Sequence, residues 1–261
     1  MRDARAATGS APVTPAPVWS MVIGLYLLTL AAQLLSLALG RLDSAQELTS
    51  MLLPSLVFLS VLTLPACWVG VVAGRRVGLG VLRSGPSGAA QAGVAGSLPR
   101  DLLVATVAGL ALGGLLVLLR GVTEPYLPQE LPAYGFRGVP GGLAVSVGAA
   151  VGEEVWFRFG LMTGLVWIAG RMFSRDVLPG AVYWLVIVLA SLGFALAHLP
   201  QLLAYGAAAP LAITGTIVGN VVVGVLYGWC YWRMGLLAAI TAHFSVDLVL
   251  HVLTALVQVA G

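Results

Sequence analysis

Long runs of apolar residues constrain this chain more than any other feature of its sequence. Seven runs of roughly 20 residues follow one another along the 261-residue chain, and a helix of about 20 apolar residues is long enough to cross a bilayer. Polar residues are too few to cover a water-facing surface, because 9% of the chain is charged against about 25% in soluble domains. The sequence therefore predicts an all-α, polytopic transmembrane helix bundle.

The apolar runs divide the chain into four parts. Residues 1–18 are rich in proline and lack a hydrophobic period, so we expect a disordered tail. Residues 19–119 should hold the N-terminal transmembrane helices, 120–140 a Pro-rich loop and 141–257 the core that carries the chemistry. The predicted spans are 19–40, 51–74, 102–119, 141–170, 178–199, 210–231 and 234–257, and an eighth span or a re-entrant segment near 200–210 would alter the topology.

Arginine placement orients these spans. All 13 basic residues are arginines, and the short cytoplasmic loops of membrane proteins carry an excess of basic residues. With seven spans, nine arginines fall on the side of the N-terminus and three on the other side. We therefore expect an integral protein of a bacterial plasma membrane with a cytoplasmic N-terminus. The lipid bilayer accounts for the composition, and nothing in it favours a nucleic-acid partner.

Three ionisable residues, Glu153, Glu154 and Arg158, interrupt the apolar span 141–170. Each costs about 2.5–3.5 kcal/mol at the centre of a membrane helix, so such residues usually mark a functional site that faces the bundle interior. On a helix, Glu154 and Arg158 are four residues apart and can pair. Glu153 is rotated by about 100° and lacks a local partner, which makes it the better general base. A polar network that only fixes helix packing is the alternative.

Two histidines and an aspartate place further ionisable groups on two other spans. His198 closes the fifth predicted span, because Pro200 disfavours helix at Leu199. His243 and Asp247 are four residues apart on one face of the seventh. Three apolar helices thus each carry ionisable groups, and a shared cluster would satisfy all of them at once. Carboxylates and imidazoles held away from bulk water suit proton transfer or metal binding better than simple packing.

In these residues the chain resembles the CAAX-protease and bacteriocin-processing family of intramembrane glutamic endopeptidases, which includes the Ras-converting enzyme of eukaryotes. Three family motifs are matched in order. The first, two Glu with an Arg four residues after the second, is matched by Glu153, Glu154 and Arg158. The second, Phe with His four on, is matched by Phe194 and His198, and the third, His with Asn or Asp four on behind spaced glycines, is matched by His243 and Asp247 behind Gly224, Gly228 and Gly235. The matches cover roughly residues 141–250.

The resemblance implies a peptidase that uses no cofactor and forms no covalent intermediate. Glu153, helped by His198, would activate a water that attacks a peptide carbonyl of a membrane-associated or lipidated substrate. His243 and the residue at position 247 would stabilise the oxyanion. The remaining motif residues, Glu154, Arg158 and Phe194, would support the site.

Position 247 departs from the Asn of the better-known family members. An ionised Asp accepts hydrogen bonds but cannot donate one to an oxyanion. Asp247 must therefore be protonated, or it must act by orienting His243 while His243 alone donates. We favour the orienting role.

Two other interpretations of the cluster remain open. Zinc could be held by Glu153, His198 and His243, although the His-Glu-x-x-His motif of common zinc peptidases is absent. Buried carboxylates and histidines also form proton relays, so a proton-coupled transporter or a non-catalytic scaffold could carry the same residues. Chelator-resistant cleavage would exclude zinc, and liposome flux that is lost in Glu153→Gln would indicate a transporter.

Overall fold

The computed structural model describes residues 17–39, 45–82, 97–174 and 178–260, and every regular element within these ranges is a helix. The elements are α1 (Val18–Leu39), α2 (Ala45–Val77), α3 (Leu98–Thr123), η1 (Glu124–Tyr126), α4 (Gly138–Glu153), η2 (Glu154–Met162), α5 (Thr163–Met172), α6 (Gly180–Ala197), α7 (Leu199–Ala204), α8 (Pro210–Met234), α9 (Leu236–Asp247), η3 (Leu248–Leu253) and α10 (Thr254–Ala260). The predicted all-α bundle is confirmed. Residues 1–16 of the predicted tail, 1–18, lie outside the described residues.

Within the described ranges, six helices are long and apolar enough to cross a membrane. They correspond to six of the seven predicted spans. The predicted span 141–170 is not among them, because it is divided into α4, η2 and α5, each too short to span alone. These three follow one another as a single rod with Glu153, Glu154 and Arg158 at its middle. This rod packs against α1, α2, α6 and α9, so we treat it as a seventh membrane element whose charges face protein.

The predicted loop 120–140 is shorter at both ends than its prolines suggested. α3 continues to Thr123, where Arg120 forms an ion pair with Glu124. α4 begins at Gly138, so Pro140 lies in its first turn. Proline is tolerated there because the first N–H groups of a helix have no intrahelical partner.

The same rule shapes the junction between α6 and α7. Pro200 was expected to prevent helix at Leu199, but α7 begins at that residue with the proline in its first turn. α6 ends at Ala197, and His198 is both the C-cap of α6 and the N-cap of α7. A histidine is thereby placed at a break between two helices.

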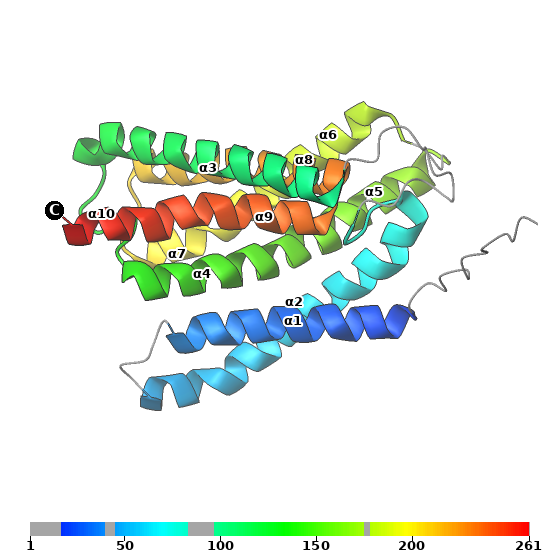
Figure 1. The fold of residues 1–261 in the computed structure, drawn as a ribbon, viewed down its shortest axis with the longest axis horizontal. Helices are drawn as coiled ribbons and strands as arrows, with labels where there is room; N and C mark the ends of the chain where they lie inside the picture. Colours follow the sequence, from blue (N-terminus) through cyan, green and yellow to red (C-terminus); the bar gives the residue numbers. More distant parts are fainter. Residues whose placement is uncertain (1–16, 40–44, 83–96, 175–177, 261) are drawn as a thin grey trace, which may run out of the picture.

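The rod formed by α9, η3 and α10 lies at the centre of the bundle. In Figure 1 it runs between α3 and α4, and it also contacts α8. Its membrane span is 61% buried, against 17–33% for the other five spans. α1 and α2 form a pair on one side, where α1 packs on α4 and α2 packs on η2. Ionisable side chains of α9 are therefore surrounded by protein rather than lipid.

Gly235 reverses the chain between α8 and the central rod. Its φ of 97° lies in a region that favours glycine. The first N–H groups of α9, on Leu236 and Leu237, donate to the carbonyls of Gly80 and Val81 at 3.0 and 3.1 Å. The segment after α2 thus caps the N-terminus of α9 and fixes its depth in the bundle.

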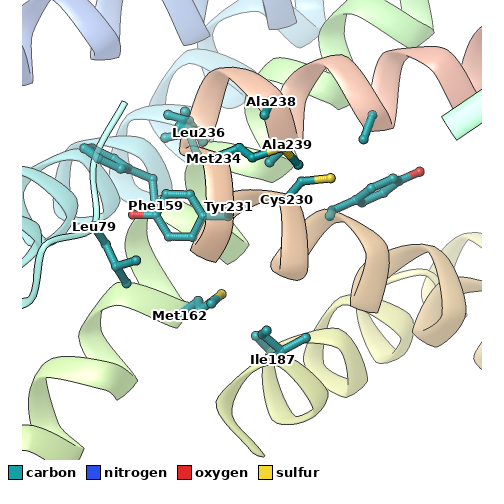
Figure 2. Packing of buried hydrophobic residues seen from close by; sticks show 14 of the residues in the cluster. Leu79, Phe159, Met162, Ile187, Cys230, Tyr231, Met234, Leu236, Ala238 and Ala239 are labelled. Carbon is teal, nitrogen blue, oxygen red and sulfur yellow. The ribbon is translucent and has the colours of Figure 1, made fainter. Parts of the chain in front are cut away.

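An apolar core fills the space beside this turn. Figure 2 shows Cys230 and Tyr231 of α8 close to Leu236 of α9, with Phe159 and Met162 of η2 beside them. All five side chains are less than 2% exposed. This core therefore packs η2, which carries Glu154, together with α8 and with α9, which carries His243.

Close packing of α3 on the central rod requires glycine. A Cβ at Gly109 would lie 2.7 Å from Cβ of Ser245, whereas a Cβ at Gly114 would meet no atom within 4 Å. We expect Gly109→Ala to lower the free energy of unfolding by about 1–3 kcal/mol. Gly114→Ala should be neutral or stabilising by up to about 1 kcal/mol, because alanine is the better helix former. Thermal unfolding in detergent micelles measures both, and equal effects would contradict this packing.

Candidate active site

Glu154 is the most deeply buried ionisable group of the cluster. Its side chain is 0% exposed, and its Oε1 lies 3.1 Å from Nη1 of Arg158. The pairing predicted from the four-residue spacing is therefore present. The same oxygen lies 2.9 Å from Nδ1 of His243, a residue 89 positions later in the chain. One carboxylate thus links η2 to the central rod.

Arg158 completes the support around this carboxylate. Its Nη2 donates to the carbonyl of Gly224 on α8 at 3.1 Å. The guanidinium carbon lies 4.6 Å from the ring centre of Phe194 and 5.2 Å from that of Tyr227, distances at which a cation is attracted to an aromatic face. Arg158 is therefore held from α6 and α8 as well as by Glu154, and Phe194 takes the supporting position expected of it.

His243 is clamped on both its ring face and its ring edge. The ring stacks on Tyr227 with centroids 4.4 Å apart and planes 11° from parallel. With Nδ1–H donated to Glu154, the other ring nitrogen, Nε2, faces Oε2 of Glu153 at 3.8 Å and Oδ2 of Asp247 at 3.5 Å. The Nδ1 contact that an orienting carboxylate makes thus belongs to Glu154, while Asp247 lies beside Nε2.

His198 also faces the cluster with its Nε2, from the junction of α6 and α7. Its Nδ1 is 2.8 Å from the carbonyl oxygen of Phe194, and a carbonyl can only accept, so Nδ1 carries the proton. Nε2 is left facing Oε2 of Glu153 at 4.0 Å. The break between α6 and α7 allows this contact, because the ring turns back onto the last turn of α6.

Glu153 therefore lies between two imidazole nitrogens. Both distances exceed the 2.7–3.2 Å of a direct hydrogen bond, and both end on the same carboxylate oxygen. The side chains of Glu153 and His198 are 23% and 27% exposed, whereas that of His243 is 4% exposed. The cluster has an open side at Glu153 and His198 and a closed side at Glu154. It brings together all seven sequence-predicted residues, namely Glu153, Glu154, Arg158, Phe194, His198, His243 and Asp247.

Sequence reasoning missed the backbone on which the carboxylates are mounted. η2 is a π-helix, in which the N–H of Thr163 donates to the carbonyl of Arg158 five residues earlier. A second π-helix, η3, begins directly after Asp247. Such wide turns are often found at functional sites. The stacking of Tyr227 was also missed; its position three residues after Gly224, on the helix that faces Arg158, was the available signal.

The described residues contain no group of three His, Cys, Asp or Glu side chains arranged to hold a metal ion. Among the candidate zinc ligands, Oε2 of Glu153 lies 4.0 Å from Nε2 of His198 and 3.8 Å from Nε2 of His243. The structure thus lends the zinc interpretation no support. The expectation that the protein uses no cofactor stays a prediction.

Buried carboxylates facing histidines across membrane helices define a candidate hydrolase site within the bilayer. Residues 136–249 match the family model described as type II CAAX prenyl endopeptidase Rce1-like. The resemblance drawn from the motifs is confirmed over residues 136–249. The match spans α4 to α9 and leaves α1, α2 and α3 outside it. Comparisons with curated proteins and with solved structures found no match.

Removing the cation from the buried pair tests how Glu154 is stabilised. Arg158→Met should lower the free energy of unfolding by about 3–5 kcal/mol, because a fully buried carboxylate loses its cation. The double variant Glu154→Gln with Arg158→Met removes both charges and should recover much of that loss. Unfolding of both variants in detergent is the measurement. A double variant less stable than Arg158→Met would contradict this account of the pair.

Proposed function

We propose that this protein is an intramembrane endopeptidase that hydrolyses a peptide bond of a membrane-associated or lipidated substrate. The single observation that carries the proposal is the position of the Glu153 carboxylate between Nε2 of His198 and Nε2 of His243. A water held there contacts a base and two imidazoles at once. The CAAX-protease family match supports the same reaction class.

In the proposed reaction, Glu153 removes a proton from the water as its oxygen bonds to the scissile carbonyl carbon. His198 accepts a hydrogen bond from the second O–H of that water through Nε2, because its Nδ1–H is already donated to a carbonyl. When the C–N bond breaks, Glu153 returns its proton to the leaving nitrogen. No covalent intermediate forms, and the base ends the cycle in its starting state.

His243 is proposed as the oxyanion donor. Its Nδ1–H is given to Glu154, so donation from Nε2 requires the imidazolium, whose charge the neighbouring carboxylates balance. The clamp by Glu154 and Tyr227 fixes the ring before the substrate arrives. A donor that needs no reorganisation is worth about 2.7–4 kcal/mol of barrier in such sites.

Asp247 is proposed as a second, protonated donor to the oxyanion rather than the residue that orients His243. Glu154 already occupies Nδ1 of His243, and Asp247 lies 3.5 Å from Nε2, on the side where the oxyanion would form. A protonated carboxyl there supplies the O–H that the Asn of other family members supplies as N–H.

The orientation proposed for the bundle follows its arginines. Of the described ones outside the cluster, Arg75, Arg76, Arg100, Arg171 and Arg233 lie at the end where α1 and α9 begin, and Arg120 and Arg137 lie at the opposite end. We propose a bacterial plasma membrane with the first end cytoplasmic. The partly exposed side chains of Glu153 and His198 lie where α6 ends, so substrate enters from the non-cytoplasmic half.

Replacing the base should abolish cleavage without unfolding the protein. Glu153→Gln keeps the size of the side chain but removes its basicity, and we expect kcat to fall by at least about 10²-fold. Glu130→Gln, at an exposed acid outside the seven residues of the cluster, is the matched control and should leave kcat unchanged. Cleavage of a fluorogenic membrane peptide in proteoliposomes measures both. Undiminished cleavage by Glu153→Gln would contradict the proposal.

Substitutions at position 247 separate a donor from an orienting carboxylate. Asp247→Asn supplies N–H at the same place, so kcat should stay within about 10-fold of the wild-type value. Asp247→Leu removes the donor and should cost about 10²–10³-fold. The cleavage assay and a thermal melt, which controls for folding, are run on both. Equal losses in the two variants would show that the negative charge itself is required.

A further inference from the structure

The rod built from α4, η2 and α5, which we call the catalytic rod, makes two polar contacts with the N-terminal helices α1 and α2, which lie outside the family match. Nε2 of Gln33 on α1 donates to the carbonyl of Gly148 on α4 at 2.6 Å. The indole N–H of Trp156 on η2 donates to Oγ1 of Thr63 on α2 at 3.0 Å. These contacts bracket the two carboxylates, because one falls five residues before Glu153 and the other two residues after Glu154.

Both contacts are closely fitted. Gly152 is the residue directly before Glu153. A Cβ added to it would clash with the amide of Gln33 and would lie 3.3 Å from the Trp156 ring. Thr63 is 0% exposed. Neither contact can slide without moving the backbone that carries the carboxylates.

This position is where the rod changes its winding. α4 ends at Glu153 and the π-helix η2 begins at Glu154, so the direction of both side chains depends on where the wide turn starts. Hydrophobic packing in a membrane sets that point weakly, because lipid tails are as apolar as a Leu side chain. Directional hydrogen bonds from α1 and α2 define it more sharply.

We propose that Gln33 and Thr63 are positioning residues, which fix the start of the π-helix and thereby aim Glu153 at His198 and His243. The N-terminal helices are then part of the catalytic apparatus rather than membrane anchors alone. This inference rests on the proposed peptidase function for its kinetic readout. It also has a readout that is independent of cleavage.

The test compares Thr63→Val and Gln33→Leu with a matched control on the same two helices. Thr63→Val is close in shape but loses the acceptor, and Thr63→Ser restores it. Tyr26→Phe removes the 2.8 Å hydrogen bond between Tyr26 and Ser60, which joins α1 to α2 about one turn from Thr63 and includes no atom of α4 or η2. Kinetics and amide hydrogen exchange over residues 148–158 are measured for every variant.

We expect Thr63→Val and Gln33→Leu to lower kcat by about 10- to 100-fold, since small misplacements of a catalytic group cost that much. KM should change by less than about twofold, hydrogen exchange over 148–158 should accelerate, and Thr63→Ser should behave as wild type. Tyr26→Phe should show neither effect. Unchanged exchange and kcat in Thr63→Val, or equal effects in Tyr26→Phe, would overturn the inference.

If the proposed function is wrong, the same experiments give a different set of results. In that case the wild type shows no cleavage that Glu153→Gln abolishes, while hydrogen exchange still reports on positioning. Faster exchange over 148–158 in Thr63→Val and Gln33→Leu, but not in Tyr26→Phe, would then support the positioning role. Unchanged exchange would overturn it independently of any substrate.

Discussion

The hydrogen bond between Glu154 and His243 is the interaction on which the remaining architecture depends. It joins two rods that are far apart in the sequence, and it does so with a charge that lipid would not accept. Arg158 balances that charge and is itself held by Gly224, Phe194 and Tyr227. With this bond in place, Nε2 of His243 faces Glu153 and Asp247. Stability and site geometry therefore come from the same few contacts.

The two neighbouring carboxylates lie in different surroundings. Glu154 is closed off from solvent, and its Oε1 is paired with a cation and an imidazole, whereas Glu153 lies on the open side with its Oε2 4.0 Å from Nε2 of His198. Consecutive residues on a helix point about 100° apart, and the rod changes from an α-helix to a π-helix between these two. π-Helical turns are often found at functional sites, and in the proposed positioning role Gln33 and Thr63 connect the N-terminal helices to this turn.

Sequence alone predicted what depends on composition and short spacing. The apolar runs predicted the spans, and the four-residue spacing of Glu154 and Arg158 predicted their ion pair. The Nδ1 partner of His243 could not be predicted, because it lies 89 residues away and depends on how two rods cross. The π-helices were missed because apolar residues surround the rod and leave no period to read. Helix at Leu199 was missed because Pro200 was read as a terminator and not as a first-turn residue.

The most direct test of the account asks whether the three helices converge on Glu153 within a membrane. Paired substitutions Glu153→Cys with His198→Cys, and Glu153→Cys with His243→Cys, are made after Cys67 and Cys230 have been replaced by alanine, and a short thiol cross-linker is applied in lipid vesicles. Both pairs should cross-link, while Glu153→Cys paired with Gly114→Cys, on the open face of α3, should not. Cross-linking of the control pair alone, or of none, would contradict the convergence that the proposed chemistry requires.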